Sequence, residues 1–150
     1  MNPFSIHLAS ANDIPSLLRF MERFYAIDGY PFDAARAQRA LTQFFAEPSH
    51  GSIFLIDVNG ETVGYIVLAV VYSFEFGGKN AFVDEFYLEP EYRGKGLGHA
   101  VMERIGKVAA ERGISALHLE VEHHNARALA LYRSFGFQDH HRVLMTKMLS

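Results

Sequence analysis

The chain has 150 residues, of which 49% are hydrophobic, and its formal net charge is −3. This length is enough for one domain with a sizeable core, so residues 1–150 are expected to form a single domain. Interspersed charges with a mildly acidic balance argue against nucleic acid or an anionic membrane as the main partner. The absence of cysteine excludes disulfides, a thiolate nucleophile and a cysteine-based zinc site.

The N-terminal sequence has neither a basic n-region nor an apolar h-region, so it does not resemble a secretion signal. The longest apolar run, residues 65–72, is far shorter than the roughly 20 residues that a membrane helix needs. We therefore expect a cytoplasmic protein without a membrane span.

The first half of the chain predicts a short strand, two helices and a β-hairpin. Apolar residues recur at helical spacing in the two helical segments. Asn59-Gly60 lies between two runs rich in β-branched residues, which is a strong hairpin signal. The opening strand is expected at residues 5–8, the helices at 13–27 and 33–45, and the hairpin strands at 52–58 and 61–72.

The second half alternates strands and helices. Strands are expected at residues 81–88, 116–121 and 143–148, and helices at 96–112 and 125–135. Gly113 and Gly136 follow the helices as stop signals, and Asn125 begins the second helix as its cap. Two strands joined by one helix run parallel, whereas the hairpin is antiparallel. The expected fold is therefore an α/β structure, a mixed sheet with helices on both faces.

A glycine-rich loop between a strand and a helix predicts a phosphate site. Glycines let the backbone approach a ligand closely, and the N-terminus of the following helix attracts an anion. Two basic side chains add positive charge, so a pyrophosphate is the expected ligand. The loop consists of Arg93, Gly94, Lys95, Gly96, Leu97 and Gly98.

Two familiar phosphate motifs do not fit this loop. The dinucleotide pattern G-x-G-x-x-G needs glycine at position 99, which is His99, and the P-loop pattern lacks its Gly-Lys-Ser/Thr. The loop does match R-x-x-G-x-G. A glycine-rich turn that serves packing alone is the alternative interpretation.

The chain resembles the GNAT superfamily of N-acetyltransferases in two segments. Residues 86–98 resemble the signature strand and pyrophosphate loop of the family, and residues 125–137 resemble its N-x-x-A-x-x-x-Y-x-x-x-G-F helix. The resemblance implies a sheet splayed between two parallel strands, with acetyl-CoA in the notch, and relatives that are often dimeric. The strand edge at Phe86, Tyr87 and Leu88 would then pair with the amides of pantetheine.

Tyr132 is the residue to which the resemblance assigns the role of general acid toward the CoA sulfur. A phenol and a thiol have comparable pKa values, so this proton transfer is nearly balanced. Asn125 and Tyr132 are seven residues apart and lie on one helix stripe, so both can face the same ligand. A core tyrosine on an amphipathic helix is the alternative interpretation.

Asp84 and Glu85 are adjacent carboxylates in an expected central strand. Successive side chains point to opposite faces, so only one need face the reaction unless a bulge redirects them. One acid would take the amine proton and the other would hold a cationic substrate, or both would form an internal ion pair with Arg142 or Lys147. The acidic pair followed by two aromatic residues is similar to the diamine (spermidine-type) acetyltransferases of the family.

Other polar residues carry weaker signals. The eight histidines show no metal-ligand spacing, so no metal is expected. Residues 28–32 either line the acceptor pocket or cap the core. The expected function is direct acetyl transfer from acetyl-CoA to a primary amine, with a small di- or polyamine as the expected acceptor and a homodimer as the expected assembly. A peptide or lysine acetyltransferase and a non-catalytic acyl-CoA-binding module are the alternatives.

Overall fold

The computed structural model describes residues 3–150, which fall into two compact units. The first unit ends at Glu120 and contains all five strands of the sheet. The second unit, Val121–Ser150, contains the helix α4 (Ala126–Ser134). That residues 1–150 form a single domain stays a prediction.

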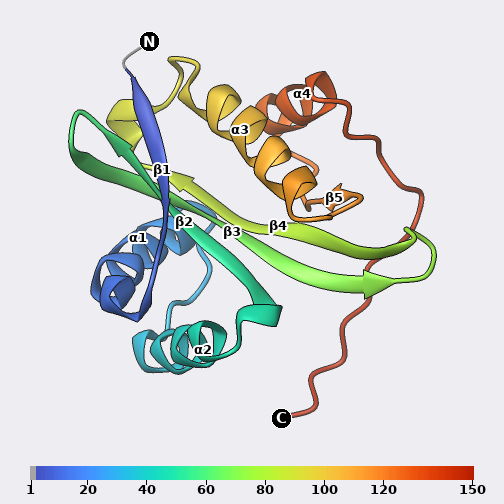
Figure 1. Cartoon of the computed structure of the whole chain (residues 1–150), viewed down its shortest axis with the longest axis horizontal. Helices are drawn as coiled ribbons and strands as arrows, with labels where there is room; N and C mark the ends of the chain where they lie inside the picture. Colours follow the sequence, from blue (N-terminus) through green and yellow to red (C-terminus); the bar gives the residue numbers. More distant parts are fainter. Residues whose placement is uncertain (1–2) are drawn as a thin grey trace. The chain divides into compact units, whose positions relative to one another are not determined.

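The sheet has the strand order β1-β2-β3-β4-β5 and mixes antiparallel with parallel pairs, which confirms the predicted fold class. The first three pairs are antiparallel, and β4 and β5 run parallel. Figure 1 shows α1 and α2 on one side of the sheet and α3 on the other. The strands are β1 (Phe4–Leu8), β2 (Gly51–Val58), β3 (Glu61–Ser73), β4 (Gly78–Leu88) and β5 (Leu117–His118); the helices are α1 (Ile14–Ile27), α2 (Ala34–Ala46) and α3 (Leu97–Glu111).

Local sequence explains where several of these elements begin and turn. Asn59 and Gly60 both have positive φ, 51° and 80°, as a two-residue hairpin turn between β2 and β3 requires. Asp33 caps α2, because its carboxylate accepts a hydrogen bond from the backbone N–H of Arg36 at 3.1 Å. These local signals place the elements within a few residues of their predicted bounds.

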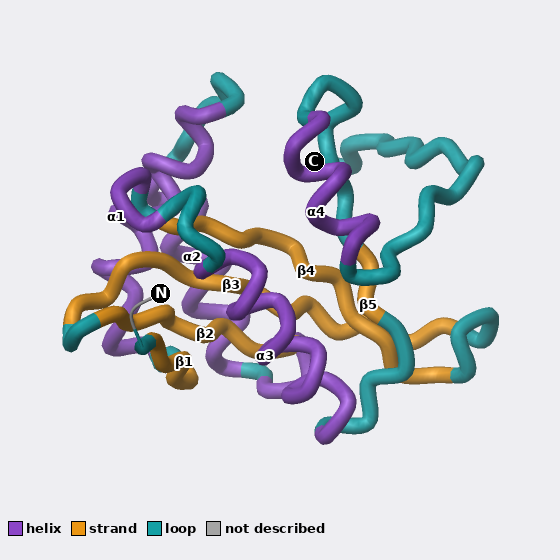
Figure 2. Tube along the Cα trace, turned by 90° about the horizontal axis from the view of Figure 1, so that it is seen from above, coloured by secondary structure: helices purple, strands orange, loops and turns teal. Residues whose placement is uncertain are grey.

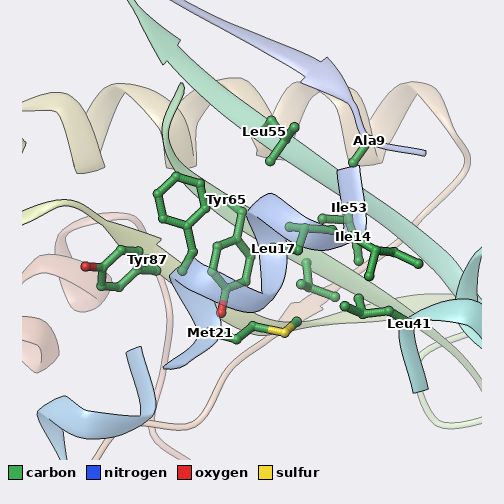
Figure 3. Packing of buried hydrophobic residues seen from close by; sticks show 11 residues of the cluster. Ala9, Ile14, Leu17, Met21, Leu41, Ile53, Leu55, Tyr65 and Tyr87 are labelled. Atoms are coloured by element: carbon green, nitrogen blue, oxygen red, sulfur yellow. The ribbon is translucent and has the colours of Figure 1, made fainter. Parts of the chain in front are cut away.

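The core lies on both faces of the sheet. On the face covered by α1 and α2, Leu17 and Tyr65 are fully buried in a cluster that Figure 3 shows from close by. On the other face, Ile56 and Ile66 are 0% exposed. A strand covered on both sides has no polar face, which explains why residues 63–68 of β3 are buried without interruption.

The sheet is splayed between β4 and β5. Only two residue pairs join them, Ala81 with Leu117 and Phe82 with His118. Figure 2 shows β4 continuing well beyond the short β5. Within the described chain no strand pairs with this edge of β4 from Val83 onward, and the predicted strand at 116–121 was too long. The open edge is the notch that the resemblance implied.

The predicted strand at residues 143–148 is wrong, because the structure places neither helix nor strand there. Val143 and Met145 are 82% and 87% exposed. The alternating apolar pattern favours an extended segment, but a strand also needs the edge of another strand for its hydrogen bonds. The second unit, as described, contains no strand to supply that edge.

Candidate active site

A β-bulge in β4 places the two adjacent carboxylates on the wall of one cavity. Val67 of β3 pairs with Glu85 and Leu68 pairs with Val83, so Asp84 is the extra residue without a cross-strand partner. A regular strand would send neighbouring side chains to opposite faces, whereas a bulge redirects one of them. Asp84 and Glu85 therefore both line the cavity.

The cavity lies between the C-terminal end of α1, the loop after it and β4, and has a volume of about 410 Å³. Three carboxylates and several apolar or aromatic side chains form its wall. Such a wall suits a ligand that combines an alkyl chain with positive charge. The lining residues are Phe24, Tyr25, Asp28, Tyr30, Pro31, Asp84 and Glu85.

Glu85 is hydrogen-bonded by two tyrosines from different elements. The Tyr25 hydroxyl on α1 donates to Oε2 of Glu85 at 2.6 Å, and the Tyr65 hydroxyl on β3 donates to Oε1 at 2.8 Å. Burial raises the pKa of Glu85, the two phenol hydrogen bonds oppose the increase, and the nearby charge of Asp84 adds to it. Burial and the Glu85 carboxylate together raise the pKa of Tyr25 and of Tyr65, so both phenols stay protonated donors.

Asp84 differs from its neighbour because it is exposed on the cavity wall. No side-chain hydrogen bond reaches its carboxylate from residues 3–150. The protein atoms around it still displace enough water to raise the pKa of its carboxyl. A carboxylate with a raised pKa and no fixed donor accepts a proton more readily than an ordinary surface carboxylate.

The glycine loop turns into α3 with its backbone in the left-handed region. Gly94 has φ 73° and Gly96, the residue that caps α3, has φ 85°. The first hydrogen bond of the helix runs from the Ala100 N–H to the Gly96 carbonyl at 3.1 Å. The N–H groups of Leu97 and Gly98 precede that bond, so the helix leaves them available to an anion.

The two basic side chains of the loop are arranged differently from each other. The Arg93 Nε donates to the Leu88 carbonyl at 2.7 Å, and its guanidinium lies 5.3 Å from the centre of the Tyr87 ring. Arg93 therefore fastens the loop to the end of β4. Lys95 is exposed, with Gly94 and Gly96 on either side of it.

The unpaired edge of β4 presents backbone groups beside this loop. The Glu89 N–H donates to the Val63 carbonyl of β3 at 2.8 Å. Because backbone groups alternate along a strand, those of Leu88 and Phe86 point away from β3, toward the open edge. Arg93 occupies the Leu88 carbonyl, which leaves the N–H of Leu88 and both groups of Phe86 for an extended amide ligand.

Asn125 and Tyr132 belong to the second unit. The Asn125 side chain accepts a hydrogen bond from the Ala128 N–H at 3.1 Å and caps α4, as expected. Tyr132 is half-buried and packs edge-on against Phe137, with ring centres 5.9 Å apart. Burial raises the pKa of Tyr132, which favours the protonated phenol that a general acid needs.

Comparison with known proteins identifies the family. The sequence profile of the acetyltransferase (GNAT) family matches residues 16–137. The chain belongs to the acetyltransferase (GNAT) family. The resemblance in the glycine loop and in the α4 segment is thereby confirmed.

Individual relatives differ in how much of the chain they match. A thialysine N-epsilon-acetyltransferase of Bos taurus is 39% identical over 77 residues, which cover 51% of this chain and 45% of that protein. This chain thus spans less than half the length of that relative.

Among solved structures, an integron cassette protein from the mobile metagenome of Cole Harbour Salt Marsh is 34% identical, with a TM-score of 0.84. That match covers 97% of this chain and 90% of the other chain. A predicted acetyltransferase of Clostridium acetobutylicum, solved with acetyl-CoA, has the same fold at 19% identity, with a TM-score of 0.81 and 98% and 97% of the two chains covered.

Sequence patterns missed the two residues that hydrogen-bond Glu85, Tyr25 and Tyr65. Tyr25 occupies a helix position and Tyr65 lies within an apolar strand run, so both fit an ordinary core pattern. The loop at residues 28–32 contributes both to the cavity wall and to the core; that the cavity holds the acceptor stays a prediction. Asp28, Tyr30 and Pro31 line the cavity, whereas Phe32 packs against the core cluster.

In residues 3–150 no group of three or more metal-ligating side chains could hold a metal ion. No helix in that part of the chain has the length and apolar character to cross a membrane.

Proposed function

We propose that this protein transfers the acetyl group of acetyl-CoA to a primary amine of a small di- or polyamine. The observation that carries the proposal is the bulge in β4, which aims two carboxylates into one cavity a few residues before the glycine loop. The amine would meet the thioester beside these acids. The chain covers only part of its thialysine-acetylating relative, so the acceptor is argued from the cavity itself.

The first unit offers the features that acetyl-CoA needs. Its pyrophosphate would lie against the left-handed turns at Gly94 and Gly96 and the N-terminus of α3. Its pantetheine amides would pair with the open β4 edge at Phe86 and Leu88. That the related fold of the Clostridium acetobutylicum protein was solved with acetyl-CoA supports this assignment.

The reaction needs a neutral amine, a new carbon–nitrogen bond and a proton for the departing thiolate. A cavity carboxylate would take the ammonium proton, and the amine nitrogen would then attack the thioester carbonyl directly. The carbon–sulfur bond breaks, and Tyr132 would protonate the sulfur. The chain has no cysteine to carry an acetyl group, so the transfer is proposed to occur in a ternary complex.

The charge of the cavity favours a second ammonium on the acceptor. Asp28, Asp84 and Glu85 line it, and no lysine or arginine is among the lining residues of the described structure. A diamine keeps one positive charge after its other amine has lost a proton, and that charge pairs with a carboxylate. An acceptor with its own carboxylate would meet like charge.

Three amines of similar length separate these effects: pentylamine, cadaverine and lysine. Cadaverine has one ammonium more than pentylamine, and lysine has one carboxylate more than cadaverine. The rates of thiol release from acetyl-CoA can therefore be compared directly. We expect kcat/KM to be highest for cadaverine, at least roughly tenfold above lysine, which corresponds to ~1.4 kcal/mol. Rates should rise with pH as the reacting amine deprotonates.

Thialysine and a peptide with a free N-terminal alanine complete the acceptor panel. Acetylation of the peptide alone would show that the acceptor is a protein amine. Equal kcat/KM for pentylamine and cadaverine would show that the acids do not recognise a second charge. Acetyl-CoA binding without transfer to any of these amines would favour an acyl-CoA-binding module.

A further inference from the structure

Two phenols bracket the Glu85 carboxylate, one on each oxygen. Tyr25 reaches Oε2 from α1 and Tyr65 reaches Oε1 from β3, at 2.6 and 2.8 Å. Hydrogen bonds to an ionised acceptor are stronger than those between neutral groups. An arrangement that donates to both oxygens stabilises the carboxylate over the carboxylic acid.

Burial and ring packing hold the Tyr65 hydroxyl in its hydrogen bond to Glu85. The residue is 0% exposed, and its ring packs against Phe20 and Tyr87 with centres 6.2 and 6.3 Å away. Figure 3 shows its ring within the buried cluster. Water cannot replace Glu85 as a partner, and a buried hydroxyl without a partner is costly. Protonating Glu85 would therefore disturb at least one of its two phenol bonds.

We propose that Tyr25 and Tyr65 are positioning residues that favour the ionised form of Glu85, the anchor for the second ammonium of the acceptor. Proton transfer then belongs to Asp84, which no side-chain hydrogen bond reaches within the described chain. This division of roles rests on the proposed function. It specifies which carboxylate recognises charge and which exchanges a proton.

The groups around Glu85 come from every element that forms this region. Tyr25 and Asp28 belong to α1 and its loop, Tyr65 to β3, and Asp84 to β4. The positive charge of Arg36 on α2 opposes the increase in the pKa of Tyr25. Burial and the charge of Asp84 favour protonation of Glu85, and the two phenols oppose it. Removing one of the two phenols should therefore shift the protonation equilibrium of Glu85 toward its neutral carboxylic acid form.

The first test is a carbon-13 NMR titration of the Glu85 carboxyl in the protein without ligand. Tyr25→Phe and Tyr65→Phe should each move its midpoint upward by roughly one pH unit, because each removes one charge-assisted hydrogen bond. Tyr87→Phe is the matched control: it removes a phenol from the same ring cluster, and this phenol bonds Glu89 instead. An unchanged midpoint in both Tyr25→Phe and Tyr65→Phe would overturn the proposal.

The second test measures acetylation kinetics in Tyr25→Phe. Tyr25 is only half-buried, so this variant keeps the test available if Tyr65→Phe does not fold. We expect KM for cadaverine to rise roughly tenfold at the acid end of the pH range, with a smaller change in kcat. The rise in KM for pentylamine, which has no second charge to anchor, should be at least roughly threefold smaller. Equal losses for the two amines would overturn the anchoring role.

The NMR titration does not depend on catalysis. If no amine is acetylated and the midpoint still moves, the proposed function fails while the hydrogen-bond control of Glu85 stands. Titrating the labelled wild-type protein with cadaverine then tests the anchor alone. A Glu85 resonance that shifts with cadaverine but not with pentylamine supports it, and identical responses overturn it.

Discussion

Gly96 lies where the glycine loop becomes α3, and Gly96→Val tests whether this turn holds the pyrophosphate of CoA. A Cβ at this position would meet no protein atom within 4 Å apart from its chain neighbours, so space for the Cβ is not limiting. It does place a branched residue at φ 85°, which costs about 1–2 kcal/mol. For a domain of this size, that corresponds to a loss of roughly 2–8 °C in Tm.

Gly113 offers a control with the same backbone strain. It follows α3 at φ 77°, and a Cβ there would also meet nothing within 4 Å. Gly113→Val should therefore lower Tm by a similar amount without changing the proposed phosphate turn. Comparing the two variants separates the contribution of the glycine loop to CoA binding from the effect of general destabilisation.

Calorimetric titration with CoA then distinguishes the two variants. We expect Gly96→Val to weaken CoA binding at least roughly tenfold, ~1.4 kcal/mol, because its side chain would fill the space beside the N–H groups of α3. Gly113→Val should bind like the wild type. A folded Gly96→Val protein with unchanged CoA affinity would refute the assignment, and equal weakening in both variants would attribute the effect to strain.

Three other predictions concern catalysis, stability and assembly. Tyr132→Phe should lower kcat on the order of a hundredfold with little change in acetyl-CoA affinity; a variant with wild-type turnover would show that the phenol only packs. Asp84→Asn should raise Tm at neutral pH. The folded protein raises the pKa of Asp84, so ionisation costs stability as pH rises through that pKa, and the gain should disappear in acid, below the unfolded pKa. A Tm difference that does not change with pH would contradict this. Self-association stays a prediction, as does a cytoplasmic location: light scattering at high concentration should show a dimer, and a monomer would count against it.

Local sequence signals determined much of this fold. The Asn59-Gly60 turn, the cap at Asp33 and the glycines at 94 and 96 act through backbone preferences that depend on neighbouring residues alone. The same locality explains why the two GNAT segments are identifiable from the amino-acid sequence alone. Asn125 was expected to cap a helix for the same reason, and it does.

The failed strand at residues 143–148 shows the limit of that reasoning. Its alternating pattern describes only the preference of one segment. Pairing depends on a second edge elsewhere in the chain or on another molecule, and no pattern within the segment specifies where that edge lies. The overlong strand prediction at 116–121 has the same cause, since β5 pairs with β4 through only two residues.

The chemistry of the cavity was decided by tertiary structure. The sequence identified Asp84 and Glu85 as candidates, but their common orientation depends on a bulge that only the pairing of β4 with β3 shows. The phenols of Tyr25 and Tyr65 come from positions 60 and 20 residues away from Glu85 along the chain. A hydroxyl at a core position has the same local sequence signal whether or not a carboxylate lies opposite. The partner of Tyr65 is set only when β3 pairs with β4, and that of Tyr25 only when α1 packs against the sheet.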